Sequence, residues 1–216
     1  MRLSTLAGQS PWNDMKYIVW LPFYLLAYLI LEQLPFSGYW ATQLSLDSYV
    51  PFCEWFVIPY CLWYSLLIGV GITLWGKNPP AFRRYMRFLA LTFLISELIW
   101  FLFPNGQDLR PTTMPRDNLL TTLISALYQI DTNTNVFPSV HVVGSVGAAL
   151  AMWDAFRNRK AIWGPITVLA ILICLSTVFI KQHSLLDLFG GLLLSFVAAI
   201  PIYHRSAVPR FFRKAA

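Results

Sequence analysis

Charged side chains are scarce in this chain. They make up 12% of its 216 residues, whereas hydrophobic residues make up 57%. A soluble domain carries about 25% charged residues. So low a charge content excludes an ordinary soluble domain and indicates that lipid, rather than water, surrounds most of the chain.

Metal-ligand patterns are missing as well. The three cysteines, Cys53, Cys61 and Cys174, lie in or beside apolar runs without the spacing of a metal site, and we interpret them as small hydrophobic residues. No carboxylate cluster suggests a metal either, so we expect neither a metal nor a cofactor. The chain also has no internal repeat, and we expect residues 1–216 to form a single membrane domain.

Six apolar stretches approach the ~20 residues that a membrane-spanning helix needs. They lie near 15–34, 55–75, 86–104, 140–156, 162–180 and 184–203, and the fourth is the shortest. The first lacks a small-residue cleavage site, so we expect it to be retained. The predicted fold class is therefore all-α, a polytopic membrane protein with six transmembrane helices.

The loop at 105–139, between the third and fourth stretches, carries a helical pattern of its own. Apolar side chains recur at helical spacing from Leu119 to Tyr128. This segment is too short to cross a bilayer, so we expect a short amphipathic helix at the membrane interface. It either covers a functional site or serves only for packing.

The net charge of +6 is unevenly distributed. One side of the predicted topology collects Arg2, Lys16, Lys77, Arg83, Arg84, Arg87, Arg157, Arg159, Lys160, Arg205, Arg210, Arg213 and Lys214. The other side holds only Arg110, Arg116 and Lys181. Because cytoplasmic loops are enriched in basic residues, both termini are predicted to be cytoplasmic. The charge thus needs no nucleic-acid partner, and the short loops favour a bacterial plasma membrane.

Two of the three histidines, His141 and His183, lie on the outer side, whereas His204 lies in the basic tail. Asp187 follows His183 by about one helical turn, so its carboxylate can accept one ring N–H of His183. The other ring nitrogen then becomes a better nucleophile. Alternatively, Asp187 only caps a helix or pairs with Lys181.

The other histidine begins the fourth stretch, directly after Pro138-Ser139-Val140. Ser139 is suited to cap that helix, and a helix N-terminus favours an anion. His141 would then lie beside a bound phosphate and could protonate a leaving oxygen. Arg110 offers a planar set of donors that suits phosphate oxygens.

Together these groups resemble the type 2 phosphatidic acid phosphatase superfamily. Its pattern is Lys-x6-Arg-Pro, then Pro-Ser-Gly-His, then Ser-Arg-x5-His-x3-Asp. Arg110-Pro111 matches the end of the first motif, and residues 138–141 match the second. Ser176, His183 and Asp187 match the third at the required spacing.

Three positions depart from this pattern. Phe103 stands where the family has lysine, Val140 replaces the glycine, and Thr177 replaces the arginine. Lys181, two residues before His183, could restore one of the two missing cations. This variant resembles the divergent branch that includes inositol phosphorylceramide and sphingomyelin synthase relatives.

The resemblance implies an integral membrane phosphatase that acts on a lipid phosphate or pyrophosphate at the outer face. His183 would attack phosphorus and form a phosphohistidine, Asp187 would stabilise its charge, and His141 would protonate the leaving oxygen. The phosphate oxygens would be bound by Arg110, Lys181 and Ser139. A phosphotransferase that moves a phosphorylated headgroup between lipids is the alternative. A non-catalytic transporter or binding protein is less favoured, since both histidines and the aspartate occur together.

Two further features lie inside the predicted spans. Glu97, deep in the third, is expected to be an interhelical hydrogen-bond partner. Glycines in the fourth and sixth would allow those helices to approach closely and bring His141 to His183. These glycines are Gly144, Gly147, Gly190 and Gly191.

Overall fold

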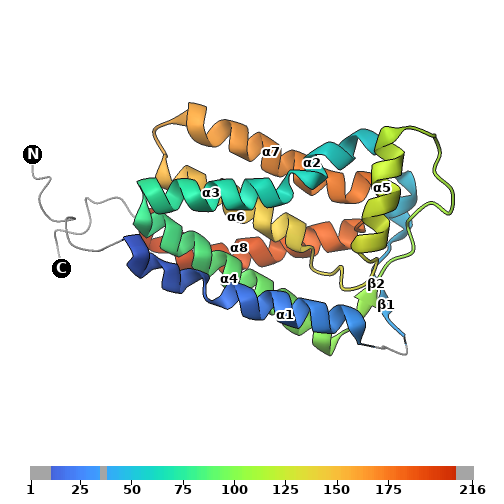
Figure 1. Cartoon of the computed structure of the whole chain (residues 1–216), viewed down its shortest axis with the longest axis horizontal. Coiled ribbons are helices and arrows are strands. Elements are labelled where there is room, and N and C mark those ends of the chain that lie inside the picture. Colours follow the sequence, from blue (N-terminus) through green and yellow to red (C-terminus); the bar gives the residue numbers. More distant parts are fainter. Residues whose placement is uncertain (1–10, 35–37, 208–216) are drawn as a thin grey trace, which may run out of the picture.

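The computed structural model describes residues 11–34 and 38–207 (Figure 1). Within them, six helices form a bundle: α1 (Trp20–Gln33), α3 (Trp63–Lys77), α4 (Pro79–Leu102), α6 (Val140–Ala155), α7 (Lys160–Phe179) and α8 (Leu185–Ala207). Successive members of this set alternate in direction, so α1 begins and α8 ends at the same end of the bundle. Arg2, Arg210, Arg213 and Lys214, which entered the charge argument, lie outside the described residues.

Shorter elements connect the bundle helices. They are η1 (Pro11–Ile18), η2 (Ser45–Tyr49), η3 (Glu54–Phe56), α2 (Val57–Cys61) and α5 (Leu119–Ile130). Two short strands, β1 (Trp40–Ala41) and β2 (Asn105–Gly106), pair in parallel. This pairing joins the segment after α1 to the segment after α4, at the end of the bundle that also carries α5.

Among the described residues, five helical segments are long and apolar enough to cross a membrane. They are Asn13–Gln33, Glu54–Lys77, Pro79–Leu102, Lys160–Phe179 and Leu185–His204. They correspond to the first, second, third, fifth and sixth predicted stretches, which confirms an all-α fold with several apolar spans. The fourth, α6, has 16 residues. At 1.5 Å per residue it is roughly 24 Å long, less than the ~30 Å hydrocarbon core, so a sixth span is not confirmed.

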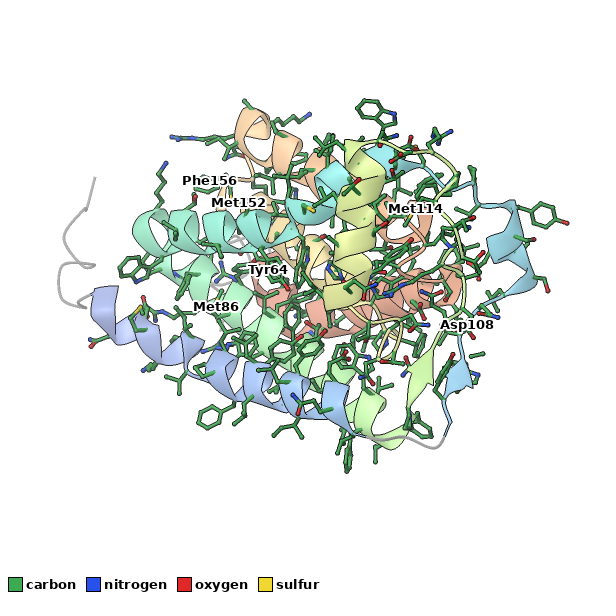
Figure 2. All side chains as sticks on the ribbon, turned by 45° about the vertical axis from the view of Figure 1, so that its right-hand side comes forward. Tyr64, Met86, Asp108, Met114, Met152 and Phe156 are labelled. Carbon is green, nitrogen blue, oxygen red and sulfur yellow. The ribbon has the colours of Figure 1, made fainter. Side chains whose placement is uncertain are left out.

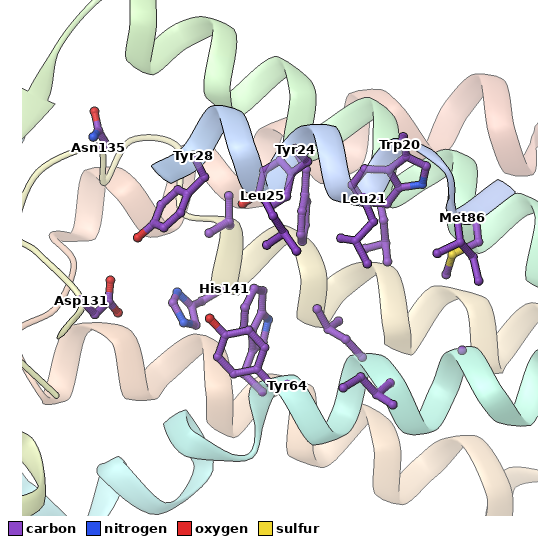
Figure 3. Close-up of a pocket in the computed structure, with 18 of the residues that line it drawn as sticks. Trp20, Leu21, Tyr24, Leu25, Tyr28, Tyr64, Met86, Asp131, Asn135 and His141 are labelled. Atoms are coloured by element: carbon purple, nitrogen blue, oxygen red, sulfur yellow. The ribbon is translucent and has the colours of Figure 1, made fainter. Parts of the chain in front are cut away.

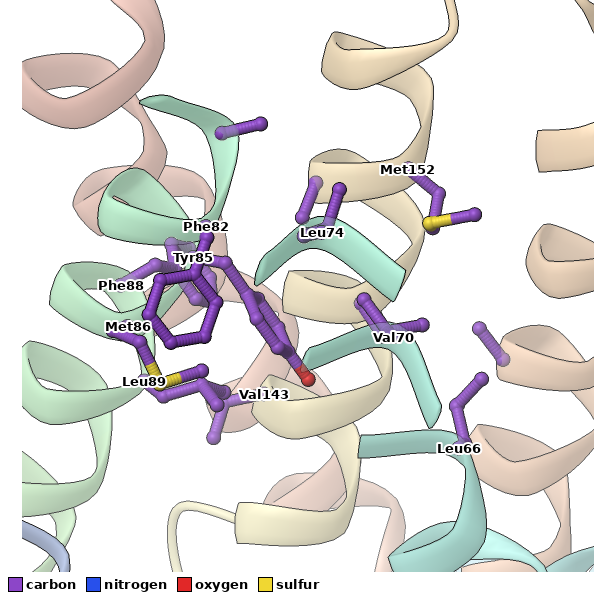
Figure 4. Packing of buried hydrophobic residues seen from close by; sticks show 14 of the residues in the cluster. Leu66, Val70, Leu74, Phe82, Tyr85, Met86, Phe88, Leu89, Val143 and Met152 are labelled. Atoms are coloured by element: carbon purple, nitrogen blue, oxygen red, sulfur yellow. The ribbon is translucent and has the colours of Figure 1, made fainter. Parts of the chain in front are cut away.

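The helix α6 lies inside the bundle. It packs against α3, α4, α7 and α8. Its buried residues include the small side chains Ala148 and Ala151, and Val143 and Met152 pack with aromatic and aliphatic residues of α3 and α4 (Figure 4). Because protein covers much of its length, the length of α6 is set by helix packing more than by the thickness of lipid.

The start of α4 differs from the prediction by about two turns, since the apolar stretch begins near residue 86 and the helix at Pro79. Asn78 caps the helix by accepting a hydrogen bond from the Ala81 N–H, at 3.2 Å. The basic first turns are tolerated because their side chains have partners. Arg84, for example, pairs with Asp154 of α6 at 2.6 Å. Helix propensity and capping therefore extend α4 beyond its apolar part.

The predicted helix between the third and fourth stretches is present as α5. It lies across the end of the bundle, roughly perpendicular to the long helices (Figure 1). Its Ile124 is buried among Val57, Tyr60 and Ile180, whereas Leu119 at its start is exposed. Figure 2 shows Asp108 and Met114 at this same end, and Phe156 toward the opposite one.

The glycines have different partners from one another. An added Cβ at Gly191 of α8 would lie 2.8 Å from Val142 Cβ and 2.9 Å from the Ser139 carbonyl oxygen, so this glycine lets α8 approach α6 as expected. Gly144 and Gly147 instead face aromatic rings, Trp63 of α3 and Phe88 of α4. Gly190 lies against the ring of Phe137.

Glu97 is buried in α4, and its Oε1 has no hydrogen-bond partner. The interhelical hydrogen bond that we expected from this side chain is therefore not made by that oxygen. No role follows from its position alone.

The contact at Gly191 predicts a specific destabilisation. We expect Gly191→Ala to lower the free energy of unfolding by about 1–3 kcal/mol, because the new methyl group meets backbone that cannot move freely. Gly164→Ala in α7 is the matched control, since an added Cβ there meets nothing within 4 Å. Thermal unfolding in detergent checks both variants. Equal midpoints for the two would contradict the tight α6–α8 contact.

Candidate active site

The two histidines of the family motifs come together in the structure. The ring centroids of His141 and His183 lie 5.7 Å apart. His141 is in the first turn of α6, and His183 lies in the turn between α7 and α8. The Ser139 N–H donates to the Asp187 carbonyl oxygen at 3.2 Å, and this bond joins the starts of α6 and α8.

His183 is held by its backbone and faces Asp187. Its N–H donates to the Thr177 carbonyl oxygen at 2.9 Å. Its Nδ1 lies 3.6 Å from Asp187 Oδ2, which is ion-pair range but longer than a hydrogen bond. Asp187 is fully buried and His183 is nearly so. The predicted spacing of one helical turn thus brings the imidazole and the carboxylate together.

Asp187 also caps α8. Its Oδ2 accepts the Ser184 N–H at 2.7 Å, and its own N–H donates to Ser184 Oγ at 3.1 Å. This reciprocal pair is a capping box with aspartate at the third helical position. The carboxylate therefore makes the cap hydrogen bonds and lies within ion-pair distance of His183, but the expected hydrogen bond to the His183 ring is not made.

His141 lies between two aromatic rings. Its ring centroid is 4.4 Å from that of Tyr60 and 4.3 Å from that of Trp63. The Tyr60 hydroxyl donates to the carboxylate of Asp131, which directly follows α5. Asp131 lines the same cavity as both histidines. Asp131 and Tyr60 could not be predicted from the sequence, because no spacing links them to the histidine motifs.

Arg110 is anchored beside His183. Its guanidinium donates to the Tyr128 carbonyl oxygen at 3.0 Å, to the Asp131 carbonyl oxygen, and to Gln182 Oε1 at 2.7 Å. It also lies over the Tyr128 ring, 4.3 Å from the centroid. Burial lowers the pKa of Arg110, and the charge of Asp131 opposes that shift. The guanidinium stays charged, since arginine does not lose its proton in proteins.

Lys181 points toward the segment that contains η2. Its ammonium donates to the Asp47 carbonyl oxygen at 3.0 Å and to the Val50 carbonyl oxygen. Burial lowers the pKa of Lys181, and the charge of Asp47 opposes the shift. The expectation that Lys181 binds phosphate stays a prediction, because in this arrangement two of its donors are already used.

The loop that leads into His141 is fixed by two side chains from other parts of the chain. Asn105 Oδ1 accepts the Val136 N–H at 2.9 Å and the Phe137 N–H at 2.7 Å. Glu32, near the end of α1, accepts a hydrogen bond from Asn135 Nδ2 at 2.7 Å. These contacts position the start of α6, and no sequence spacing predicts them.

Ser139 occupies the predicted N-cap position of α6, but its hydroxyl makes no capping hydrogen bond. The Ser139 carbonyl oxygen accepts the Val143 N–H, as an N-cap carbonyl ordinarily does, and the Ser139 hydroxyl is buried without a hydrogen-bond partner. The capping bond that we expected is therefore absent, although the residue does precede the helix.

Polar atoms without partners gather at this site. The buried side-chain atoms that have no hydrogen-bond partner include Arg110 Nε, Ser139 Oγ, His141 Nδ1, His183 Nδ1 and Asp187 Oδ1. Buried polar groups are rarely left unpaired, because each costs about 1–3 kcal/mol. A polar ligand that pairs with several of them would be bound favourably. In the described part of the chain, no group of three or more His, Cys, Asp and Glu is placed to hold a metal ion.

The comparison with known families bears on this arrangement. The model of the PAP2 superfamily matches residues 84–209, which is more than half of the chain. The chain belongs to the PAP2 superfamily. No curated protein and no solved structure matches it. The PAP2 match includes both histidines, Asp187 and Arg110, and it supports a lipid enzyme of the phosphatase or phosphotransferase type.

The positions that depart from the PAP2 pattern have clear places in the fold. Phe103 directly follows α4 as its C-cap residue, and its side chain is 63% exposed. The Thr177 hydroxyl donates to the Cys174 carbonyl oxygen at 2.8 Å, along its own helix. Neither residue supplies a cation. Among the residues matched to PAP2 motifs, the permanent positive charge is therefore that of Arg110.

The double role of Asp187 can be separated by two substitutions. We expect Asp187→Asn to keep the cap but to lower lipid phosphate turnover by roughly 10²- to 10⁴-fold, because the charge beside His183 is lost. Ser184→Ala keeps that charge and removes one half of the capping box, so it should cost about 1 kcal/mol of stability with turnover retained. Initial rates and thermal midpoints check this. Full lipid phosphate turnover in Asp187→Asn would contradict a role for the Asp187 charge beside His183.

Proposed function

We propose that this PAP2 protein is a lipid phosphate or pyrophosphate phosphatase that forms a phosphohistidine on His183. The observation that carries the proposal is the set of unpaired buried polar atoms on the residues of the family motifs. They come from three separate parts of the chain, and two of them belong to the histidines themselves. Among them, Arg110 Nε and Ser139 Oγ can donate hydrogen bonds to the oxygens of a phosphoryl group.

The reaction would proceed in two steps. The His183 nitrogen that faces away from Asp187 attacks phosphorus, and the bond from phosphorus to the lipid oxygen breaks. His141 gives its proton to that leaving oxygen. In the second step His141 takes a proton from water, which attacks phosphorus and releases phosphate from His183. Asp187 stabilises the positive charge on the imidazole while the phosphohistidine exists.

The phosphate oxygens would be bound by Arg110 and by the start of α6. Arg110 keeps one donor, Nε, without a partner, and its charge balances that which builds on the phosphoryl group. Ser139 Oγ and the first N–H groups of α6 supply further donors. Lys181 contributes positive charge from beside Asp47 and Val50, and a direct bond to phosphate would require it to leave those carbonyl oxygens.

A phosphotransferase is the second candidate, and Asp131 favours it. Its carboxylate lies at the polar end of the cavity beside His141 (Figure 3). There it could accept a hydrogen bond from the hydroxyl of an acceptor lipid. In that reaction the second step would use this hydroxyl in place of water.

The membrane arrangement forms part of the proposal. We place the histidine end of the bundle at the outer face of a bacterial plasma membrane, with both termini in the cytoplasm and the chain acting as one membrane domain. The basic residues of the α3–α4 and α6–α7 turns, such as Lys77 and Arg159, lie at the opposite end. The positive-inside rule supports this orientation.

Phosphate release from purified protein in detergent tests the proposal. The panel contains phosphatidate, phosphatidylglycerol phosphate, undecaprenyl pyrophosphate and a sphingolipid phosphate, with a chelator present. We expect release by the parent and loss of release in His183→Ala. His204→Ala is the matched control and should stay active, since this exposed histidine lies near the other end of α8.

The outcomes separate the candidates. Release that survives His183→Ala would contradict the phosphohistidine. Transfer to a second lipid alcohol, without release to water, would favour the phosphotransferase. Neither activity with any lipid of the panel would contradict both.

A further inference from the structure

An apolar cavity of about 540 Å³ extends from the two histidines between α1, α3 and α4 (Figure 3). Its polar end is formed by His141, His183, Asp131 and Asn135. Among the described residues that line the cavity, Asp131 is the one carboxylate, and beyond this end the walls are mostly apolar and aromatic. A phosphate that reacts with the histidines would lie at this end, and the remainder of the cavity suits hydrocarbon.

The cavity is long and narrow. One wall runs from Ile18, at the end of η1, along α1 to Tyr28, and on α3 the lining runs from Trp63 to Trp75. At 1.5 Å per helical residue each wall is roughly 15 Å long. Figure 3 shows Met86 and Trp20 at the end opposite His141 and Asp131. Large side chains thus line the far end.

The cavity also has a side that faces lipid. α1 packs against α4, and α4 packs against α3, but α1 and α3 are not among the helix pairs that pack extensively in the described residues. Leu25 of α1 and Ile68 and Ile72 of α3 line the cavity and are about half exposed or more. A hydrocarbon chain of a lipid could therefore enter the cavity laterally from the bilayer, between α1 and α3.

We propose that this cavity holds one unbranched hydrocarbon chain of the lipid phosphate and selects for its length; this inference rests on the proposed function. Beyond the polar end the walls offer few hydrogen-bonding groups, chiefly tyrosine hydroxyls and tryptophan ring N–H groups, so a polar ligand would leave most of its own groups unpaired there. A hydrocarbon chain has none, and with its phosphate at the histidines it would extend toward Trp20 and Met86. Chains that reach beyond those side chains must bend out between α1 and α3.

The far part of the cavity, near Met86, contains a position that can be filled without touching the histidines. Gly71 of α3 lines it, and the nearest atom to an added Cβ is Met86 Cε at 4.0 Å. Gly71→Leu would therefore place a side chain across the path of the hydrocarbon. Gly69→Leu is the matched control on the same helix, because Gly69 is exposed, lies outside the cavity lining, and has open space around an added Cβ.

The experiment compares phosphate release from a short-chain and a long-chain phosphatidate, dihexanoyl and dipalmitoyl. We expect Gly71→Leu to lower kcat/KM for the long-chain lipid about tenfold and to leave the short-chain lipid little changed. Met86→Ala should shift the preferred length toward longer chains, a gain that a folding defect cannot produce. Equal effects on both lipids, or no effect of Gly71→Leu, would overturn the inference.

A binding measurement separates failure of this inference from failure of the proposed function. In the His183→Ala background, n-alkyl phosphates with a bromine at the chain end are added, and tryptophan fluorescence is recorded. Trp20 and Trp75 line the far part of the cavity, so quenching should be strongest for chains that reach them and should decrease in Gly71→Leu. Such quenching without turnover of any lipid would support the cavity and contradict the phosphatase. Quenching that is independent of chain length would overturn the cavity.

Discussion

The contact between the first turns of α6 and α8 determines where the two histidines lie. Gly191 leaves room for Val142 and for the Ser139 carbonyl, and the Ser139 N–H bonds to the Asp187 carbonyl oxygen. His141 extends from one side of this contact, and His183 directly precedes the other. Because helices transmit small shifts along their length, a displacement here would separate the imidazoles and remove Asp187 from His183.

Cations bound to backbone carbonyls hold the loops around that contact. Lys181 joins the α7–α8 turn to the η2 segment, where the Asp47 carboxylate in turn accepts the Leu185 N–H at the start of α8. Arg110 joins the loop after α4 to the end of α5. These hydrogen bonds occupy donors of Lys181 and Arg110 that could otherwise bind a phosphate. With Phe103 at the usual lysine position, the site has fewer free cations than the family pattern provides, and Arg110 serves both structure and binding in our account.

Hydropathy predicted the five long apolar helices because a bilayer demands such helices, whereas a sixth span is not confirmed. The helical spacing around Ile124 predicted α5. The hydropathy pattern misplaced the start of α4. The basic residue Arg84 lies within this helix because its charge is neutralised by Asp154, a partner that lies far away in sequence. The His183–Asp187 pair was predictable because a spacing of four residues, across the start of α8, brings the two side chains close together. Asp131, by contrast, reaches His141 only through the packing of α2, α3 and the end of α5. Contacts between distant loops leave no periodic signal, and the same holds for the direction of Lys181.

The proposed mechanism requires a covalent phosphohistidine at His183, and chemical trapping can detect it. The protein would be mixed with a lipid labelled on phosphorus, quenched in alkali within the first turnover, digested, and analysed by mass spectrometry. We expect phosphate on the peptide that contains His183, and no phosphate on that peptide in His183→Ala. Label on another residue, or steady phosphate release without any covalent label, would contradict it.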